Sequence, residues 1–224
     1  MYKLFFKRII DVLLSSLAIL ILSPLLLPVI VGLLLTGEHY VFYFQERIGY
    51  KNKKFSIYKF ATMLKDSPNI GTGLHTILKD SRILLMGGFL RKTKINELPQ
   101  LFNIFLGSMS IIGPRPLVYK TFEPYSDNVK NNIYNVKPGL SGIGSIVFRN
   151  EEELLSKSNM PLEDYYKIYI SPYKGDLELW YQKKISFCTD FMIIFLTIWV
   201  VLFPKSDLVF KVFKDLPSKP DFLK

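Results

Sequence analysis

The sequence has little of the sulfur and imidazole chemistry from which many active sites are built. A single cysteine, Cys188, excludes an intramolecular disulfide and a CxxC metal or redox pair, and it is consistent with a reducing, cytoplasmic setting. The two histidines, His39 and His75, lie far apart in the chain and give a histidine-based zinc site or a Ser/His/Asp triad little to build from. Any bound metal is therefore expected to be a hard cation held by oxygen ligands.

Acidic residues are also in the minority. The 224 residues include 29 lysines and arginines but only 19 aspartates and glutamates, which gives a formal net charge of +10. Such an excess suggests an anionic partner, either nucleic acid, anionic lipid or a phosphorylated substrate. The basic residues are spread along the chain without a recognisable DNA- or RNA-binding motif, so no nucleic-acid partner is expected.

Charged residues are absent altogether from one long apolar segment, Val12 to Leu35. A helix of this length exceeds the roughly 20 residues needed to cross a bilayer core. Ser23-Pro24 lies near its middle, where proline removes a backbone hydrogen bond and kinks a helix. Basic residues flank the segment on both sides, namely Lys3, Lys7, Arg8, Arg47, Lys51, Lys53 and Lys54.

Because both flanks are basic, the positive-inside rule assigns no orientation to a straight span. A bent helix that enters one leaflet and returns keeps both flanks on the cytoplasmic side. We therefore predict a re-entrant membrane helix over residues 1–36, kinked at Ser23 and Pro24, and a cytoplasmic domain over residues 37–224. A plain single span is the alternative. A cleaved signal peptide is not expected, because the apolar run is too long and no A-x-A-like site closes it.

The rest of the chain predicts an α+β fold that is mostly helical. Aromatic and β-branched runs over residues 41–47 and 55–60 flank a glycine and a Lys-Asn-Lys-Lys turn, which is typical of a β-hairpin. Short helices are predicted over residues 82–90 and 97–106. A loop is predicted over residues 66–79, which contain one proline and two glycines.

Two apolar stretches near the C-terminus are predicted to be interfacial helices around the cytoplasmic core. Residues 191–203 are apolar but too few to cross a bilayer, so they predict an interfacial or core helix. Residues 208–213 mix apolar side chains with neighbouring lysines. This mixture suits an interfacial surface, and a C-terminal helix packed on the domain is an equal alternative.

The stretch KINELPQLFNIFLGSMSIIGPRP, residues 94–116, carries the candidate chemistry. Asn96 is a strong helix N-cap residue and Glu97 would lie in the first turn, so the free amides of this helix start suit an anion. Arg91 lies just upstream, and Arg115 stands between two prolines that restrict its backbone. A guanidinium group can bind two phosphate oxygens at once through two parallel N–H donors. From spacing alone, a capped helix with solvated basic residues is favoured over a phosphate-binding site.

A second candidate segment, residues 137–145, has three glycines after Pro138, so its backbone can approach a ligand closely. An ordinary loop is the alternative, since the spacing matches no phosphate-binding motif.

A series of motifs along almost the whole chain decides between a functional and a purely structural interpretation of these segments. The motifs are Lys7-Arg8-Ile9-Ile10-Asp11, Ser23-Pro24, Gln45-Glu46-Arg47-Ile48-Gly49, FSIYKFATM at 55–63, Phe89-Leu90-Arg91, ELPQLFN at 97–103, Met109-Ser110, GPRP at 113–116, Val136-Lys137-Pro138-Gly139 and LELWYQKKISF at 177–187. In order and spacing they resemble the bacterial sugar transferase family, the monotopic phosphoglycosyl transferases.

The resemblance implies transfer of a sugar-1-phosphate from a nucleoside diphosphate sugar, usually a UDP-sugar, to polyprenol phosphate, usually undecaprenyl phosphate, with release of UMP. Such a reaction is the first membrane step of surface polysaccharide or glycoconjugate synthesis. The enzyme would lie at the bacterial inner membrane with its catalytic domain facing the cytoplasm. The donor would arrive from the cytosol and the lipid acceptor from the bilayer.

The resemblance also assigns roles to residues. Asn96 and Glu97 take the catalytic positions, Glu97 helps to hold Mg²⁺, and further residues bind the substrate phosphates or form the donor-binding loop. The phosphate-binding residues are Arg91, Arg115 and Lys59, and the loop residues are Lys137, Pro138, Gly139 and Gly142. The sequence predicts no oligomeric state.

The chain departs from the family pattern at four positions. The family usually has an Asp-Glu dyad whose Asp attacks the donor, and here that Asp is Asn96, an amide that is a poor nucleophile. Ser108 stands where Asp is common, Ala61 where a basic residue is usual, and Ile143 where Trp is frequent. The last two bear on nucleotide and sugar preference.

Three mechanistic hypotheses follow from Asn96. In the first, the acceptor phosphate attacks the donor directly, with Mg²⁺ on Glu97 and the arginines neutralising the developing charge. In the second, Glu97 is the nucleophile, which demands a shifted geometry. In the third, the chain keeps the fold but has lost activity and acts as a membrane scaffold.

Overall fold

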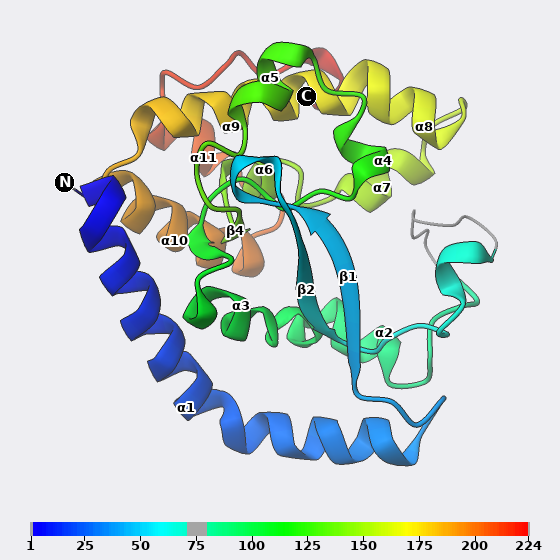
Figure 1. The fold of residues 1–224 in the computed structure, drawn as a ribbon. Coiled ribbons are helices and arrows are strands. Elements are labelled where there is room, and N and C mark those ends of the chain that lie inside the picture. Colours follow the sequence, from blue (N-terminus) through cyan, green and yellow to red (C-terminus); the bar gives the residue numbers. More distant parts are fainter. Residues whose placement is uncertain (1, 71–79, 224) are drawn as a thin grey trace.

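The computed structural model describes residues 2–70 and 80–223, and it shows a mostly helical chain partly enclosed by one long bent helix (Figure 1). A π-helical turn, Tyr2–Phe6, leads into this helix, α1 (Lys7–Leu35), which follows one side of the molecule, changes direction and follows a second side. The predicted class, α+β and mostly helical with a small hairpin, is confirmed. Of the predicted loop, residues 71–79 lie outside the described residues, and Ser67–Asn69 forms a 3₁₀ turn.

The bend in α1 has a local chemical basis in its sequence. Pro24 has no amide hydrogen, so it cannot bond the carbonyl of Leu20 one turn earlier. The hydroxyl of Ser23 donates to that carbonyl instead, at 2.8 Å, which satisfies the group that the proline leaves open. Pro28 is a second proline in the same helix and removes another bond one turn later. The Ser23-Pro24 pair thus lies in a helix that is bent rather than broken (Figure 1).

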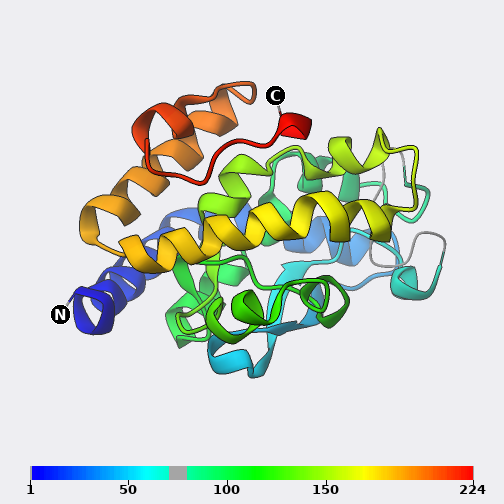
Figure 2. The same ribbon diagram turned by 90° about the horizontal axis from the view of Figure 1, so that it is seen from above.

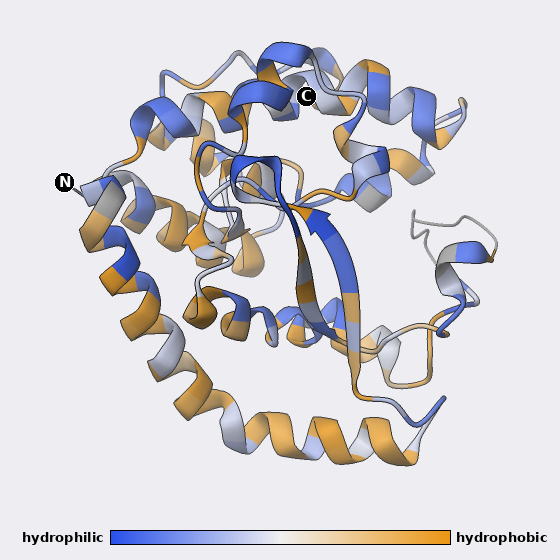
Figure 3. Ribbon diagram, viewed as in Figure 1, coloured by the Kyte–Doolittle hydropathy of each residue, from blue (hydrophilic) through white to orange (hydrophobic). Residues whose placement is uncertain are grey.

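α1 is the one helix in residues 2–70 and 80–223 that is long and apolar enough to cross a membrane. It is hydrophobic along almost its whole length, whereas α5 (Asp127–Asn132) and the tip of the hairpin are hydrophilic (Figure 3). Many of its apolar side chains are exposed, including Leu13, Leu17, Leu20, Ile21, Leu27 and Leu35. Such exposure in a helix of this composition calls for an apolar environment. The bend is the shape expected of a re-entrant helix, and insertion and orientation stay predictions.

The predicted hairpin is present, with strand ends shifted by one residue. β1 (Phe42–Ile48) pairs antiparallel with β2 (Lys54–Phe60), and the register runs from Phe42 opposite Phe60 to Ile48 opposite Lys54. Lys51 and Asn52 in the turn have positive φ angles of 56° and 57°. The alternation of the strands places residues 43, 45 and 47 on the same face as 55, 57 and 59.

Short elements build the rest of the domain. They are α2 (Gly87–Lys92), a 3₁₀ turn (Ile95–Glu97), α3 (Gln100–Leu106), β3 (Ser110–Ile112), α4 (Tyr119–Phe122), α5, β4 (Gly139–Ser141), α6 (Ile143–Val147), α7 (Glu151–Ser156), α8 (Leu162–Tyr165), α9 (Ser171–Lys184), α10 (Phe187–Leu202) and α11 (Leu208–Val212). β3 and β4 form a second, parallel pair, Ser110 opposite Gly139 and Ile112 opposite Ser141. A π-helical turn, Tyr166–Ile170, joins α8 to α9.

Two of the predicted helices begin later in the chain than expected. The first spans residues 87–92 instead of 82–90, because Arg82 is tied outside the helix in a buried ion pair with Asp80 at 2.5 Å. The second spans 100–106 instead of 97–106, and the prediction that Asn96 caps it is wrong. Lys94 has a positive φ of 61°, which turns the chain just before Asn96. Only one 3₁₀ turn then forms before α3 starts behind Pro99.

The main core packs α6, α9, α10 and α11 against one another. α9 crosses the molecule, and α10 and α11 lie together along one side of it (Figure 2). On α10, Ile193, Leu196 and Val200 are buried while Phe187, Phe191 and Phe195 are exposed, so this helix has both a core face and an outer apolar face. α11 buries Val209, which favours the packed alternative for residues 208–213.

Candidate active site

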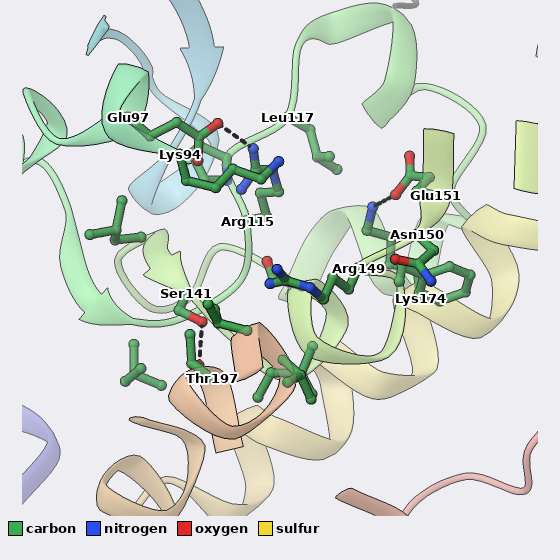
Figure 4. A pocket seen from close by; sticks show the side chains of 18 of the residues that line it. Lys94, Glu97, Arg115, Leu117, Ser141, Arg149, Asn150, Glu151, Lys174 and Thr197 are labelled. Carbon is green, nitrogen blue, oxygen red and sulfur yellow. Dashed lines mark hydrogen bonds and ion pairs between the residues drawn. The ribbon is translucent and has the colours of Figure 1, made fainter. Parts of the chain in front are cut away.

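A cavity of about 730 Å³ lies where β1, the 3₁₀ turn, β3, β4, α6, α7 and α10 meet. Figure 4 shows Glu97, Lys94 and Arg115 close together on one side of it, and Arg149 reaching in from beyond the end of α6. The lining holds five basic and three acidic side chains, which leaves two positive charges in excess. The cavity is therefore electrostatically suited to a ligand with about two negative charges.

Glu97 is the centre of the charged part of the cavity. Its Oε1 accepts hydrogen bonds from Lys59 Nζ at 3.0 Å and from Arg115 Nη2 at 2.8 Å, and its side chain is 15 % exposed. Burial alone would raise the pKa of Glu97, but Arg115 and Lys59 outweigh it and hold the pKa well below its usual range. Glu97 is thus a permanent carboxylate at neutral pH.

Two of the cations near Glu97 come from the hairpin. Arg47 on β1 and Lys59 on β2 lie on the same face because the alternation places residues 47 and 59 together. Burial lowers the pKa of Arg47 to about 10, and nearby Arg115 adds to the effect. Burial also lowers the pKa of Lys59 to about 8, against the attraction of Glu97. Glu97 therefore neutralises only part of the positive charge of Arg47, Lys59 and Arg115.

The loop that carries Arg115 is held in place by a buried tyrosine. Tyr134 donates to the carbonyl of Arg115 at 2.8 Å and accepts from the amide of Leu117 at 2.9 Å. Arg47 donates to the carbonyl of Pro116 at 3.2 Å. Together with the two flanking prolines, these bonds restrict the backbone from which the guanidinium of Arg115 reaches Glu97.

Three predicted site residues, Arg115, Glu97 and Lys59, are therefore brought together by ion pairs. Glu97 and Arg115 line the cavity, whereas Lys59, Asn96 and Arg91 are not part of its lining. Asn96 is 6 % exposed, and its Oδ1 has no hydrogen-bond partner among the described residues. Arg91 on α2 contacts Met63 Sδ at 3.6 Å. The predicted role of each of these residues in the reaction stays a prediction.

The predicted donor-binding loop lies beside the cavity rather than in its lining. Lys137, Pro138, Gly139 and Gly142 are not among the lining residues, whereas their neighbours Leu140, Ser141 and Ser145 are. The glycines serve backbone packing, since a Cβ on Gly139 would come 2.1 Å from the amide nitrogen of Gly113. Ser141 is bound across to α10 by a hydrogen bond with Thr197 at 2.8 Å.

Sequence reasoning missed several cavity residues. Arg47 belongs to the basic flank of the apolar segment, and the hairpin alternation also places it on the same face as Lys59. Lys94 opens the stretch 94–116 without a pattern that marks it as a site residue, and Arg149 carries no signal in the sequence that marks it. Lys174 forms a buried ion pair with Glu151 at 2.5 Å on the opposite wall, and the two residues are 23 positions apart.

The described residues contain no group of three or more His, Cys, Asp or Glu side chains that could hold a metal ion. Glu97 is the single carboxylate at the charged centre, and Lys59 and Arg115 both bind its Oε1, which leaves Oε2 as the available ligand atom. Magnesium is often held by one or two carboxylates together with substrate phosphates. The residues fit such a shared site and do not form one by themselves.

Comparisons with known proteins agree with one another. The family model described as bacterial sugar transferase matches residues 2–204. A UDP-glucose:undecaprenyl-phosphate glucose-1-phosphate transferase from Klebsiella pneumoniae is 33% identical over 189 residues, which cover 83% of this chain and 39% of the relative. An undecaprenyl-phosphate galactose phosphotransferase from Salmonella typhimurium is 31% identical over 88% of this chain and 40% of its own length. The exopolysaccharide production protein ExoY of Sinorhizobium fredii is 37% identical over 65% of this chain and 70% of its own length.

Proposed function

Because the chain belongs to the bacterial sugar transferase family, we propose that it transfers a sugar-1-phosphate from a UDP-sugar to undecaprenyl phosphate and releases UMP. The observation that carries this proposal is the cavity, in which Glu97 and Arg115 form a charged centre and the lining has two positive charges in excess. Lys59 binds Glu97 from outside the lining. The diphosphate of a nucleoside diphosphate sugar carries about the matching negative charge. The chain spans about 40% of the length of these two transferases, so their activities support the proposal by analogy.

We further propose that transfer is direct. A phosphate oxygen of the acceptor attacks the β-phosphorus of the donor, a new P–O bond forms, the bridging P–O bond breaks, and UMP leaves with the bonding electrons. Arg115 neutralises the charge that develops on the transferred phosphoryl group, and Glu97 fixes the position of Arg115 and Lys59. No covalent enzyme intermediate is formed.

Two features favour direct transfer over a covalent route. Asn96 is an amide and is buried outside the cavity lining, so it is neither chemically nor spatially suited to attack the donor. Glu97 faces the cavity, but its carboxylate is paired with two cations and its lowered pKa makes it a weak nucleophile. The second mechanistic hypothesis is thereby disfavoured.

Magnesium belongs to the proposal as a partner of the donor. Glu97 Oε2 together with phosphate oxygens would hold the ion, which would supply positive charge to the departing UMP. The surplus of cations around Glu97 opposes binding of a divalent ion before the diphosphate arrives. We therefore expect the chain to bind Mg²⁺ only together with the nucleotide.

The proposed location is the cytoplasmic face of the bacterial inner membrane, with α1 as a re-entrant helix. The bend at Ser23-Pro24 and the exposed apolar surface of α1 support it. The reaction would belong to a surface polysaccharide pathway. At this location the cavity is accessible both to a lipid acceptor in the bilayer and to a soluble donor.

A donor screen tests the proposed activity. The purified chain in undecaprenyl phosphate-containing liposomes is incubated with Mg²⁺ and each of several UDP-sugars, and UMP release is measured together with lipid-linked sugar. We expect release with one or a few donors, and none without lipid phosphate. The absence of release with every donor would contradict the proposal and favour the scaffold.

A further inference from the structure

One wall of the cavity is apolar, whereas another part of the lining carries the charged centre. This wall comes from β3, β4 and α10, and its side chains are Ile111, Ile112, Leu140, Ile194, Ile198 and Val201, here called the α10 wall. Lys94, Arg115 and Arg149 line the same cavity (Figure 4). The cavity is therefore amphiphilic, with a cationic end and an apolar end.

The α10 part of this wall is a single stripe of the helix. Ile194, Thr197, Ile198 and Val201 follow the spacing i, i+3, i+4, i+7 that places side chains on one face. Ile198 is 58% exposed and Val201 is 52% exposed, so both lie at the surface of the protein while also lining the cavity. The cavity thus opens at the apolar outer surface of α10.

The inner part of the wall rests on α1. The amide of Ile111 donates to the carboxylate of Asp11 on α1 at 2.9 Å, and the side chain of Ile111 packs in the same cluster as Ala18 and Ile19. Leu98, another lining residue, packs against the second half of α1. The α10 wall is therefore formed in part by α10 and contacts α1, the two helices whose exposed apolar faces suit a bilayer.

Resting on the proposed function, we propose that the α10 wall binds the polyprenyl chain of the lipid acceptor and guides its phosphate to Arg115. A polyprenol phosphate has an anionic head and a long apolar chain, and the cavity offers a cationic end and an apolar end that reaches the surface of α10. A soluble sugar nucleotide has no group that requires an exit onto an apolar surface. The wall is accordingly a determinant of acceptor affinity and not of donor binding.

The test compares Ile198→Ser with Phe195→Ser in steady-state kinetics. Both residues are exposed apolar residues of α10, but Phe195 does not line the cavity. We expect Ile198→Ser to raise the KM for undecaprenyl phosphate by about five- to tenfold through lost apolar contact. The KM for the donor and kcat should stay within about twofold, Ile198→Val should restore the acceptor KM, and Phe195→Ser should behave like the native chain.

Two results would overturn the inference. Equal acceptor KM values in Ile198→Ser and Phe195→Ser would show that the α10 wall does not contact the chain. A rise in the donor KM alone would show that the wall holds the nucleobase instead. If the native chain shows no turnover, the proposed function fails, and direct binding of undecaprenyl phosphate in detergent then decides: weaker binding only in Ile198→Ser supports the inference, and equal binding in both variants contradicts it.

Discussion

Glu97 and Glu178 are both buried glutamates near the same cavity, yet their surroundings give them opposite properties. Glu97 is bound by Lys59 and Arg115, and these cations hold its pKa well below the usual range despite burial. Burial raises the pKa of Glu178 to about 8, and the positive charge of Lys174 offsets only part of this. Neither carboxylate oxygen of Glu178 has a hydrogen-bond partner within the described part of the chain.

The opposite pKa shifts of Glu97 and Glu178 show that burial alone does not decide the charge of a carboxyl group. A carboxylate that is bound by two cations stays ionised inside the protein. A carboxyl group whose desolvation is only partly offset by positive charge is held neutral at moderate pH. Glu97 can therefore act in chemistry that needs fixed charge. Glu178, whose Oε1 lies against Gly144, is held neutral at that pH by its raised pKa.

The largest effect is expected from Glu97→Gln. The change removes the charge that orders Lys59 and Arg115, so UMP release should fall by about 100-fold or more. Glu178→Gln is the matched control, because it makes the same chemical change at the second buried glutamate. Similar losses of kcat in both variants, with both folded by circular dichroism, would remove the functional distinction between the two residues.

A smaller loss is expected from Arg115→Lys. Lysine keeps the positive charge near Glu97 but lacks the planar fork that binds two phosphate oxygens, so kcat should fall by about tenfold. Lys59→Arg keeps the charge on the buried hairpin side and serves as the comparison. Full activity in Arg115→Lys would mean that Arg115 contributes charge only.

Glu178 should make the chain less stable as pH rises. Its folded pKa of about 8 lies above the ordinary value of 4.5, so the folded state retains a proton that the unfolded state loses. Its stabilising contribution is complete below about pH 4.5 and is lost as pH rises toward 8. Glu178→Gln removes this dependence.

Thermal unfolding of the native chain and Glu178→Gln in detergent, at pH 5 and pH 8, measures this effect. The variant should gain in unfolding temperature relative to the native chain at pH 8 more than at pH 5. An equal difference at both pH values would show that Glu178 does not titrate in this range.

The smallest effect is expected from Asn96→Asp. The residue is buried and does not line the cavity, so a carboxyl group there should change UMP release by less than about threefold under direct transfer. UMP release under the conditions of the donor screen measures it. A large gain would mean that the native chain is an impaired member of the covalent class.

Much of this fold was predictable because its signals are local. The apolar run of α1, the Ser23-Pro24 bend and the alternating hairpin all follow from neighbouring residues. The start of α3 was missed because the positive φ of Lys94 forces a turn that residue preferences alone do not reveal. Glycine spacing at residues 139 and 142 suggested ligand approach, but the chain uses these positions for backbone contact with Gly113.

The candidate site was predicted in part. Glu97 and Arg115 lie in one short stretch, so the sequence places them close together, and resemblance added Lys59. Arg47, Arg149 and the α10 wall come from distant segments that only the packing brings to one cavity. Two of the basic flank residues have partners in the domain: Lys7 binds Asp190, and Arg8 binds the carbonyls of Ile104 and Phe105. These cations join α1 to the domain.

Transfer without a covalent intermediate is tested most directly with the UDP-sugar that is active in the donor screen, labelled in its β-phosphate. The chain is incubated with the donor alone and with undecaprenyl phosphate, and then denatured. With both substrates, UMP should be released and the label should pass to the lipid. Without the acceptor, neither UMP nor labelled protein should form. Release of UMP in the absence of acceptor, with label retained on the denatured chain, would contradict the account.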